Sequence, residues 1–339
     1  MRLIKTEDAV GHVLCHDMTQ IIKDQYKDAR FRKGHVVTEE DIPVLLSMGK
    51  EHLYVWEMTS GMVHENDAAE RLLALCGQEN MIRSGVKEGK IELKAACDGV
   101  FLVDSARLVA VNSQDEVMIA TRKGGMAVRE GDKLAGMRVI PLIIEEEKLR
   151  KAEQAAGDKP LLSLKPYVRK TACIVATGGE VKKGLIKDTF TPVVIDKLKT
   201  YGIETLEVVY SGDGVENVRD AVLTMREKKP DMILCTGGMS VDPDDNTPGG
   251  IKAAGANIIA YGAPVLPGAM FLLGYFDDGM PVMGLPGCVM YAGATVFDLV
   301  LPKIAADVPV TRADLAAFGE GGLCLGCKPC HYPICPFGK

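Results

Sequence analysis

The chain of 339 residues is long enough for about two average domains, and 47% of its residues are hydrophobic, which excludes disorder throughout. A formal net charge of −6 excludes a global basic field, so we expect neither nucleic acid nor an anionic membrane as a partner. Charges interrupt the first apolar segment too early for a signal peptide, and no apolar stretch approaches the roughly 18 residues of a bilayer span. We therefore expect a cytoplasmic protein.

Residues 1–60 are predicted to form a small α+β subdomain. Thr38 followed by Asp41 resembles a capping box, and the apolar residues after it supply one face of a helix. Gly49 is a natural end for this helix, and residues 52–56 then read as a strand.

Residues 61–144 are predicted to form a mainly β subdomain with one helix. Apolar residues recur with helical spacing from Glu65 to Cys76, and Gly77 is a natural stop. Four short extended runs follow, IELKA, GVFLVD, EVMIAT and MRVIPLII, separated by turn-forming or charged residues.

Residues 145–169 change character. The run EEEKLRKAEQAAGDKP is charged and helix-prone, and it is typical of a solvated helical linker; a partner-binding helix is the alternative. We expect the boundary between two larger parts of the chain here.

Residues 170–310 alternate cleanly between strands and helices. Strands are predicted at 171–176, 204–210 and 231–235, separated by helices at about 191–201 and 215–228. This order indicates an α/β fold with right-handed crossovers, a largely parallel sheet and helices on both faces. A hairpin turning at Asp277 to Gly279, followed by a helix from about 290 to 306, makes the sheet mixed.

Three glycine turns each follow an apolar strand of this region. In an open α/β sheet, ligands bind beyond the carboxyl ends of the strands, where glycine turns bring backbone N–H groups close to an anion. The alternative is that each glycine only closes a tight turn. The turns are Thr177-Gly178-Gly179-Glu180, Thr236-Gly237-Gly238 and Leu285-Pro286-Gly287.

Aspartates gather beside the second turn. Asp242, Asp244 and Asp245 follow it within a few residues, and Asp188 and Asp213 follow the first two strands. Mg²⁺ favours one or two carboxylates together with phosphate oxygens, so an anion cradle beside acids predicts a magnesium–phosphate site. A solvated acidic loop is the alternative.

The order and spacing of these pieces resemble a known family. They are TGGEV at 177–181, Asp188, SGD at 211–213, TGGMSVDPDDNT at 236–247, Pro267-Gly268 and Leu285-Pro286-Gly287. Together they resemble the molybdopterin-binding domain shared by molybdopterin adenylyltransferases and molybdopterin molybdotransferases, the family that includes gephyrin. Residues 1–60 look more loosely like pieces of the molybdotransferase accessory domains.

The resemblance implies a three-layer α/β/α domain that binds the phosphate and pterin of molybdopterin or of its adenylylated form. It places Asp245 where the family's site aspartate follows the GG-S motif. From this position and from the carboxylates beside it, we predict Asp245 and Asp244 as catalytic residues and Mg²⁺ at Asp242 and Asp245. The ligand-binding residues implied are Thr177, Gly178, Gly179, Glu180, Asp188, Asp213, Thr236, Gly237, Gly238, Ser240, Pro267, Gly268, Pro286, Gly287 and Cys288.

Two residues depart from the family pattern. Leu266 stands where the family commonly has Lys before Pro-Gly, which removes a cation for phosphate or molybdate. Cys288 stands where it commonly has Asn, which exchanges an amide for a thiol. An exposed thiol beside a helix N-terminus is expected to have a lowered pKa; a small packed residue is the alternative.

The tail, residues 319–339, holds four of the ten cysteines, Cys324, Cys327, Cys330 and Cys335. Disulfides are disfavoured in the cytosol, and the spacing resembles that of bacterial ferredoxins with the last interval one residue longer. We predict a bound metal rather than a free reactive tail. An iron–sulfur cluster and Zn²⁺ both suit four cysteines, and His331 is a borderline ligand that favours zinc.

The leading hypothesis is a transferase of molybdenum-cofactor biosynthesis that inserts molybdate into adenylylated molybdopterin with Mg²⁺. A homo-oligomer and a client molybdoenzyme are expected partners. One alternative is a non-catalytic molybdopterin carrier or sensor that uses the tail for docking. Another is a pyridine-nucleotide hydrolase related to the nicotinamide mononucleotide deamidases, in which related domains occur.

Overall fold

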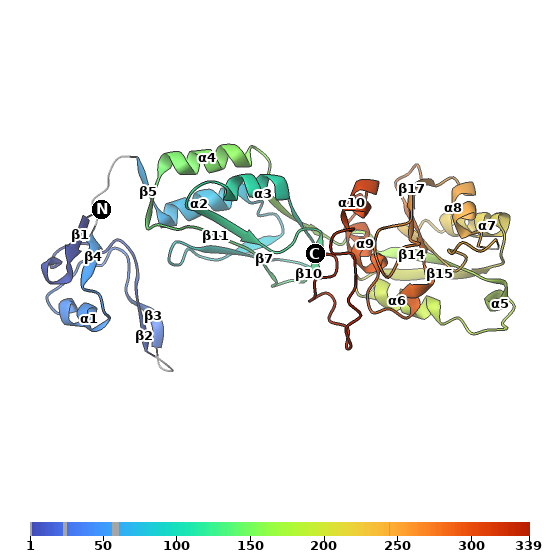
Figure 1. The fold of residues 1–339 in the computed structure, drawn as a ribbon, viewed down its shortest axis with the longest axis horizontal. Helices are drawn as coiled ribbons and strands as arrows, with labels where there is room; N and C mark the ends of the chain where they lie inside the picture. The colour runs from blue at the N-terminus through green and yellow to red at the C-terminus, as the bar shows by residue number, and fades with distance from the viewer. Residues whose placement is uncertain (1, 23–25, 56–60, 244) are drawn as a thin grey trace. The chain divides into compact units, whose positions relative to one another are not determined.

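The computed structural model describes residues 2–22, 26–55, 61–243 and 245–339 (Figure 1). Within these ranges no helix has both the length and the apolar character needed to span a bilayer. The fold divides into two compact units. Unit 1 comprises Met1–Ala96, Val103–Gly124 and Gly131–Ser163, and unit 2 comprises Cys97–Leu102, Gly125–Glu130 and Leu164–Lys339.

Unit 1 begins with two antiparallel strand pairs and one helix. The pairs are β1 (Arg2–Lys5) with β4 (His52–Val55), and β2 (Met18–Ile22) with β3 (Tyr26–Phe31); a short 3-10 helix spans Thr6–Asp8. The predicted helix is α1 (Asp41–Ser47), and the Asp41 carboxylate accepts hydrogen bonds of 2.8 Å from both the N–H and the hydroxyl of Thr38. This is one half of the predicted capping box; the other half is absent, because the Asp41 N–H donates to the Thr38 carbonyl oxygen and the N-cap, Glu40, makes no side-chain cap. Leu14, Leu45 and Leu53 are buried in the core beside the helix.

The rest of unit 1 is built on a four-stranded antiparallel sheet. Its order is β6 (Met81–Arg83), β7 (Ile91–Ala95), β11 (Lys133–Val139) and β9 (Val117–Thr121), while β5 (Met62–His64) pairs with β12 (Ile143–Glu145). The predicted helix is present as α2 (Glu65–Leu75). The prediction of one helix is wrong, however, because α3 (Ser105–Asn112) follows Asp104, whose carboxylate accepts the Arg107 N–H at 3.1 Å.

The predicted solvated linker at 145–169 is also wrong. A helix does form there, α4 (Glu146–Ala156), but it packs against α2 and α3 within unit 1. Its Leu149 and Ala152 side chains are 1% and 0% exposed, because they supply an apolar stripe on a helix that is otherwise charged. Strand β13 (Leu162–Pro166) follows and pairs in a small sheet ordered β10 (Met126–Val128), β8 (Gly99–Val103), β13.

Unit 2 is organised by a six-stranded mixed sheet. Strands β15, β14, β16 and β19 run parallel, and β18 is antiparallel to both of its neighbours, which confirms the predicted hairpin and the mixed sheet. The order is β15 (Glu204–Ser211), β14 (Thr171–Thr177), β16 (Met232–Thr236), β19 (Pro281–Leu285), β18 (Leu272–Tyr275) and β17 (Asn257–Tyr261).

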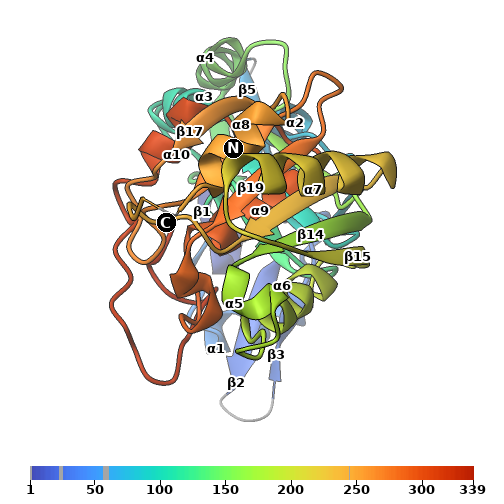
Figure 2. The ribbon, with the colours of Figure 1, turned by 90° about the vertical axis from the view of Figure 1, so that its right-hand side faces the viewer.

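Helices cover both faces of this sheet (Figure 2). Helices α6 (Phe190–Lys199) and α9 (Val296–Ala305) bury their apolar side chains with Ile174, whereas α7 (Val215–Glu227) and α8 (Thr247–Ala253) pack with Val175. Successive side chains of a strand point to opposite faces, so β14 supplies both apolar layers. The predicted α/β/α architecture is confirmed. Three short helices complete the unit, α5 (Gly179–Lys182), the 3-10 turn η2 (Gly287–Met290) and α10 (Arg312–Ala317).

Candidate functional site

Four of the predicted segments begin in one row at the carboxyl edge of the sheet. In the strand register, Thr177 lies beside Ser211, and Thr236 lies beside both Ala176 and Leu285. The loops that follow these parallel strands therefore begin side by side, as they do at the ligand sites of open α/β sheets. The segments that meet here are 177–179, 211–213, 236–238 and 285–287. The expected shared edge is confirmed, and the binding role of these residues stays a prediction.

The first and second glycine turns pack directly on each other. The Thr177 hydroxyl donates to the Thr236 carbonyl oxygen at 3.0 Å and lies 3.1 Å from the Thr247 hydroxyl. Gly237 and Gly238 have φ values of 82° and 56°. A Cβ at 237 would overlap with the Thr177 carbonyl oxygen, and one at 238 would stand 2.6 Å from the Thr247 hydroxyl oxygen. Both glycines are therefore required by the backbone and by the close approach of the loops.

The same turn leaves one donor for a ligand. The parallel pairing of Thr236 with Leu285 uses the Gly237 N–H, whereas no described residue accepts a hydrogen bond from the Gly238 N–H. The first turn differs, because Gly178 donates to the Ser211 carbonyl oxygen at 3.3 Å and Gly179 donates to the Asp213 carboxylate at 3.0 Å. An unused backbone donor beside a rigid strand end suits an anion, so the second turn is the better candidate for holding phosphate.

The acidic loop after the second turn is folded onto Asp245. This carboxylate accepts the Ser240 N–H at 2.9 Å, and the Asp245 N–H donates to the Asp242 carbonyl oxygen at 2.9 Å. Asp245 is half-buried, Asp242 is exposed, and Asp244 lies outside the described residues. Only one oxygen of the Asp245 carboxylate is engaged with described residues, so the other is available to a cation or ligand.

Tyr261 is a site residue that the motifs did not predict. It ends β17, and its hydroxyl donates to the carbonyl oxygens of Met239 at 2.9 Å and Ser240 at 3.3 Å. Burial, with a smaller contribution from the nearby Asp245 charge, raises the pKa of its phenol, which therefore stays a donor. The interaction fixes the start of the acidic loop to an antiparallel part of the sheet.

Asp213 and Asp188 are engaged in holding the fold. Asp213 accepts the Gly179 N–H, and a Cβ at 179 would stand 2.8 Å from that carboxylate. Asp188 accepts the N–H groups of Phe190 at 2.9 Å and Thr191 at 3.0 Å, which caps the start of α6. Burial acts to raise the pKa of Asp188, but hydrogen bonds from Thr191, Phe190 and Tyr210 outweigh it and lower the pKa.

A lysine near the first turn supplies positive charge that the motifs did not predict. Lys182 lies in α5, where its ammonium nitrogen would stand 3.9 Å from a Cβ placed on Gly212. It is exposed and forms no salt bridge with a described residue. Glu180 is in the same short helix, exposed, with a carboxylate oxygen 3.7 Å from the position of a Cβ on Gly178.

The turn after β19 differs from the other glycine turns. Gly287 has no positive φ, and a Cβ placed on it would meet nothing within 4 Å. The fold therefore has no need of a glycine here, whereas a ligand that approaches the backbone closely would. Cys288 follows in η2 and is half-buried. Its predicted lowered pKa is wrong, because burial raises the pKa of this thiol.

The Pro-Gly pair serves packing more than binding. The Pro267 carbonyl oxygen accepts the Val296 N–H at 3.3 Å, and a Cβ on Gly268 would stand 2.6 Å from the Val296 side chain. The pair thus fixes the start of α9. Leu266 is 57% exposed, and its N–H and carbonyl are both hydrogen-bonded to the tail, at Gly322 and Cys324.

Neither predicted metal site is formed as a ready set of ligands. Across the described ranges, no three His, Cys, Asp or Glu side chains converge in a way that holds a metal ion. The tail cysteines Cys324, Cys327, Cys330 and Cys335 nevertheless line one cavity, together with His331.

Two family models match the chain. Residues 173–306 match a model described as "Probable molybdopterin binding domain", which confirms the resemblance drawn from the motifs for this domain. Residues 3–57 match a domain of unknown function, DUF8806. These matches place the molybdopterin-binding-type domain within unit 2.

Similar proteins have also been found by sequence and by structure. A CinA-like protein of Mycobacterium tuberculosis is 33% identical over 76 residues, which are 22% of this chain and 18% of that protein. A CinA-like protein of Petrotoga mobilis is 32% identical over 76 residues, which are 22% of this chain and 19% of that protein. The matched segment is thus under a fifth of these relatives' length.

Three solved structures with low sequence identity to this chain were also found. MoaB from Thermus thermophilus has 16% identity and a TM-score of 0.36, covering 42% of this chain and 98% of its own. The Mog protein from Mycobacterium ulcerans has 19% identity and a TM-score of 0.34, and the match covers 41% of this chain and 97% of that protein. A molybdenum cofactor biosynthesis protein from Pyrococcus furiosus has 13% identity and a TM-score of 0.27, and the match covers 93% of this chain and 64% of that protein. At these TM-scores the matches add no argument.

Proposed function

We propose that the protein acts in molybdenum-cofactor biosynthesis, binding adenylylated molybdopterin at the carboxyl edge of the unit 2 sheet and inserting molybdate. The observation that carries this proposal is the alignment of turns in one row, with the N–H group of Gly238, unused by the described residues, in the turn whose Ser240 N–H binds Asp245. The family match to residues 173–306 supports the pterin as ligand.

The phosphate groups are assigned to the second turn. The N–H group of Gly238 donates to a phosphate oxygen, and Lys182 supplies a positive charge from α5. Gly287 lets the ligand approach the backbone of the third turn without a side chain between them. Because net charge is −6, the anion must be held by such local groups rather than by a global field.

Mg²⁺ fits the free oxygen of Asp245 and the exposed Asp242, since this ion is held by one or two carboxylates plus substrate phosphates. When bound, it would neutralise phosphate charge and favour cleavage of the phosphoanhydride. The chain's own contribution is positioning. Ser240 and Tyr261 hold the acidic loop, and the Asp245 carboxylate is oriented through the Ser240 N–H.

Cys288 is assigned to the dithiolene or molybdate end of the ligand. Because burial raises its pKa, the side chain is a neutral thiol near pH 7 and contributes a weak donor rather than a nucleophile. No covalent intermediate with the protein is part of the proposal.

Turnover tests the enzymatic assignment. Purified protein incubated with adenylylated molybdopterin, molybdate and Mg²⁺ is expected to release AMP, and Asp245→Asn is expected to abolish release while ligand still binds. Asp220→Asn is the matched control, because Asp220 is an exposed aspartate of α7 paired with Arg219. Failure of the wild-type protein to release AMP would contradict catalysis.

A non-catalytic molybdopterin carrier is the second candidate. Leu266 favours it, because this exposed apolar side chain replaces a cation and its backbone is committed to the tail. Tight binding of adenylylated molybdopterin without AMP release would support the carrier. The homo-oligomer and the client molybdoenzyme stay predictions, and so does the pyridine-nucleotide hydrolase; ammonia release from nicotinamide mononucleotide would identify the last.

A further inference from the structure

The cysteine-rich tail is docked on unit 2 rather than free. Leu266 donates to the Gly322 carbonyl oxygen at 2.9 Å, and the Cys324 N–H donates to the Leu266 carbonyl oxygen at 2.8 Å. Farther along, the Tyr332 hydroxyl donates to the Asp298 carbonyl oxygen at 3.0 Å, and Phe337 is only 2% exposed. Two anchors therefore hold the segment between them against the domain.

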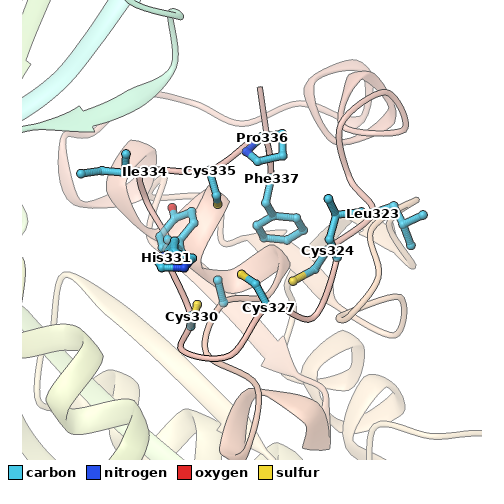
Figure 3. A pocket seen from close by; sticks show the side chains of 12 residues that line it. Leu323, Cys324, Cys327, Cys330, His331, Ile334, Cys335, Pro336 and Phe337 are labelled. Atoms are coloured by element: carbon cyan, nitrogen blue, oxygen red, sulfur yellow. The ribbon is translucent and has the colours of Figure 1, made fainter.

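The four tail cysteines lie around one cavity of about 260 Å³ (Figure 3). Cys324 and Cys335 are half-buried, Cys327 and Cys330 are exposed, and none of them forms a disulfide. The rest of the wall is largely apolar, including Leu323, Ile334 and Phe337. Thiols are thus the main strong metal ligands at this cavity, and His331 is the other.

The size of the cavity distinguishes two kinds of metal centre. A single zinc ion binds its thiolate ligands at a Zn–S distance of about 2.3 Å, so four thiolates must converge on one point. Over the described residues no such convergence of three ligands occurs. The cavity of about 260 Å³ lies between the thiols and leaves room for a polynuclear group.

We propose that Cys324, Cys327, Cys330 and Cys335 hold an iron–sulfur cluster in this cavity. Four cysteine thiolates are the usual ligand set of such clusters, and apolar walls shield the inorganic core from water. His331 lines the cavity without being a ligand. The cluster site is separate from the pterin site, and its existence does not depend on the proposed function.

The cavity is also backed by a fixed piece of the domain. A Cβ on Gly293 would stand 2.7 Å from the Cys330 sulfur, so the tail fits against the segment between the Leu-Pro-Gly turn and α9 only because residue 293 is glycine. This contact holds one ligand in place before any metal arrives, and it predicts that Gly293→Ala displaces Cys330 and weakens the cluster.

Metal and sulfide analysis of the full chain, purified anaerobically, tests the proposal. We expect iron and acid-labile sulfide in about equal molar amounts with a broad visible absorption band. The pair Cys327→Ser and Cys330→Ser is expected to lose most of the iron and the band. Cys97→Ser is the matched control, since Cys97 is a half-buried thiol that does not line the tail cavity, and it should retain both.

Other outcomes would overturn the cluster. Stoichiometric zinc without iron, and loss of that zinc in His331→Ala, would assign a mononuclear site; His331→Ala is expected instead to keep its iron. A wild-type protein free of metal would remove the centre altogether, as would a double serine variant that retains iron. Because Cys327 and Cys330 are exposed, circular dichroism of the double variant should match the wild-type protein and separate ligand loss from unfolding.

Discussion

The turns at the carboxyl edge of the sheet and the cysteine-rich tail are positioned in opposite ways. The turns follow buried parallel strands whose register aligns Thr177, Thr236 and Leu285 before any ligand is present. The tail contains no helix or named strand beyond α10 among the described residues, and a few hydrogen bonds and buried aromatic side chains hold it. Strand register alone fixes the positions of the turns. The tail is held only partly by its own contacts, and the proposed thiolate ligation would fix the rest of it.

This difference changes what a substitution does. A side chain added at Gly237 or Gly238 collides with a framework that cannot relax, because interiors are close-packed. A side chain removed from the tail costs little packing but removes a ligand. The two regions should therefore be distinguished by measuring folding free energy and ligand or metal content on the same variants.

The largest effect on stability is expected for Gly237→Ala. Its positive φ costs a non-glycine residue roughly 1–3 kcal/mol, and the new methyl group also overlaps with the Thr177 carbonyl oxygen. Urea unfolding should show a loss at least of that size. Gly287→Ala is the matched control, expected to leave the unfolding free energy within about 0.5 kcal/mol while weakening pterin binding. Equal losses for the two variants would contradict the distinction between them.

Asp188→Ala is expected to rank next. Loss of the cap on α6 should lower the unfolding free energy by about 0.5–2 kcal/mol near pH 7. Because the pKa of Asp188 is lowered in the folded protein, its stabilisation is present above the unfolded value of about 3.9 and is lost as pH falls through the folded pKa. The gap between wild type and variant should therefore close in acid, and a gap that widens there would refute the capping role.

Tyr261→Phe should have a smaller effect on stability but a visible effect on binding. The lost hydrogen bond, which one hydroxyl hydrogen shares between the Met239 and Ser240 carbonyl oxygens, is worth about 0.5–1.5 kcal/mol. Since Tyr261 holds the acidic loop, the Mg²⁺ dependence of pterin binding should move to higher concentration. Titration of Mg²⁺ with each protein measures this, and Tyr54→Phe, an exposed tyrosine of β4, is the control.

Tyr332→Phe should have the smallest effect in metal-loaded protein and a larger one after metal is removed. The hydroxyl anchors the tail to Asp298, but a bound cluster would hold the same segment through four thiolates. Hydrogen exchange at the Cys324 amide, which donates to Leu266, reports on tail docking. An identical change in loaded and stripped protein would show that ligation contributes nothing to the docking.

Regular alternation made much of unit 2 predictable from sequence. Its strands and helices carry the periodicities of a buried sheet and of amphipathic helices, so the mixed sheet and the shared edge of the turns could be expected. Helix α3 was missed because its run GVFLVDSARLVAVN reads as extended, although Asp104 before Ser105 is a cap signal. The burial of α4 depends on its partners α2 and α3, which charge composition does not reveal.

The site was less predictable than the fold. Its residue types followed from motifs, but the roles of Asp188 and Tyr261 depend on where distant segments meet, such as β17 and the acidic loop. The pKa of Cys288 was mispredicted because exposure was assumed, whereas the folded chain buries the thiol. Local sequence carries no direct signal for either kind of contact.

The contrast between Gly237 and Gly287 has a consequence for sequence variation among relatives. A glycine that the fold requires should persist with its steric neighbours, so positions 177, 237 and 247 are expected to vary together, if at all. A glycine in open space is constrained only by what binds there. Relatives with a residue other than glycine at position 287 are therefore expected to bind a different ligand or none, while positions 177 and 237 stay the same.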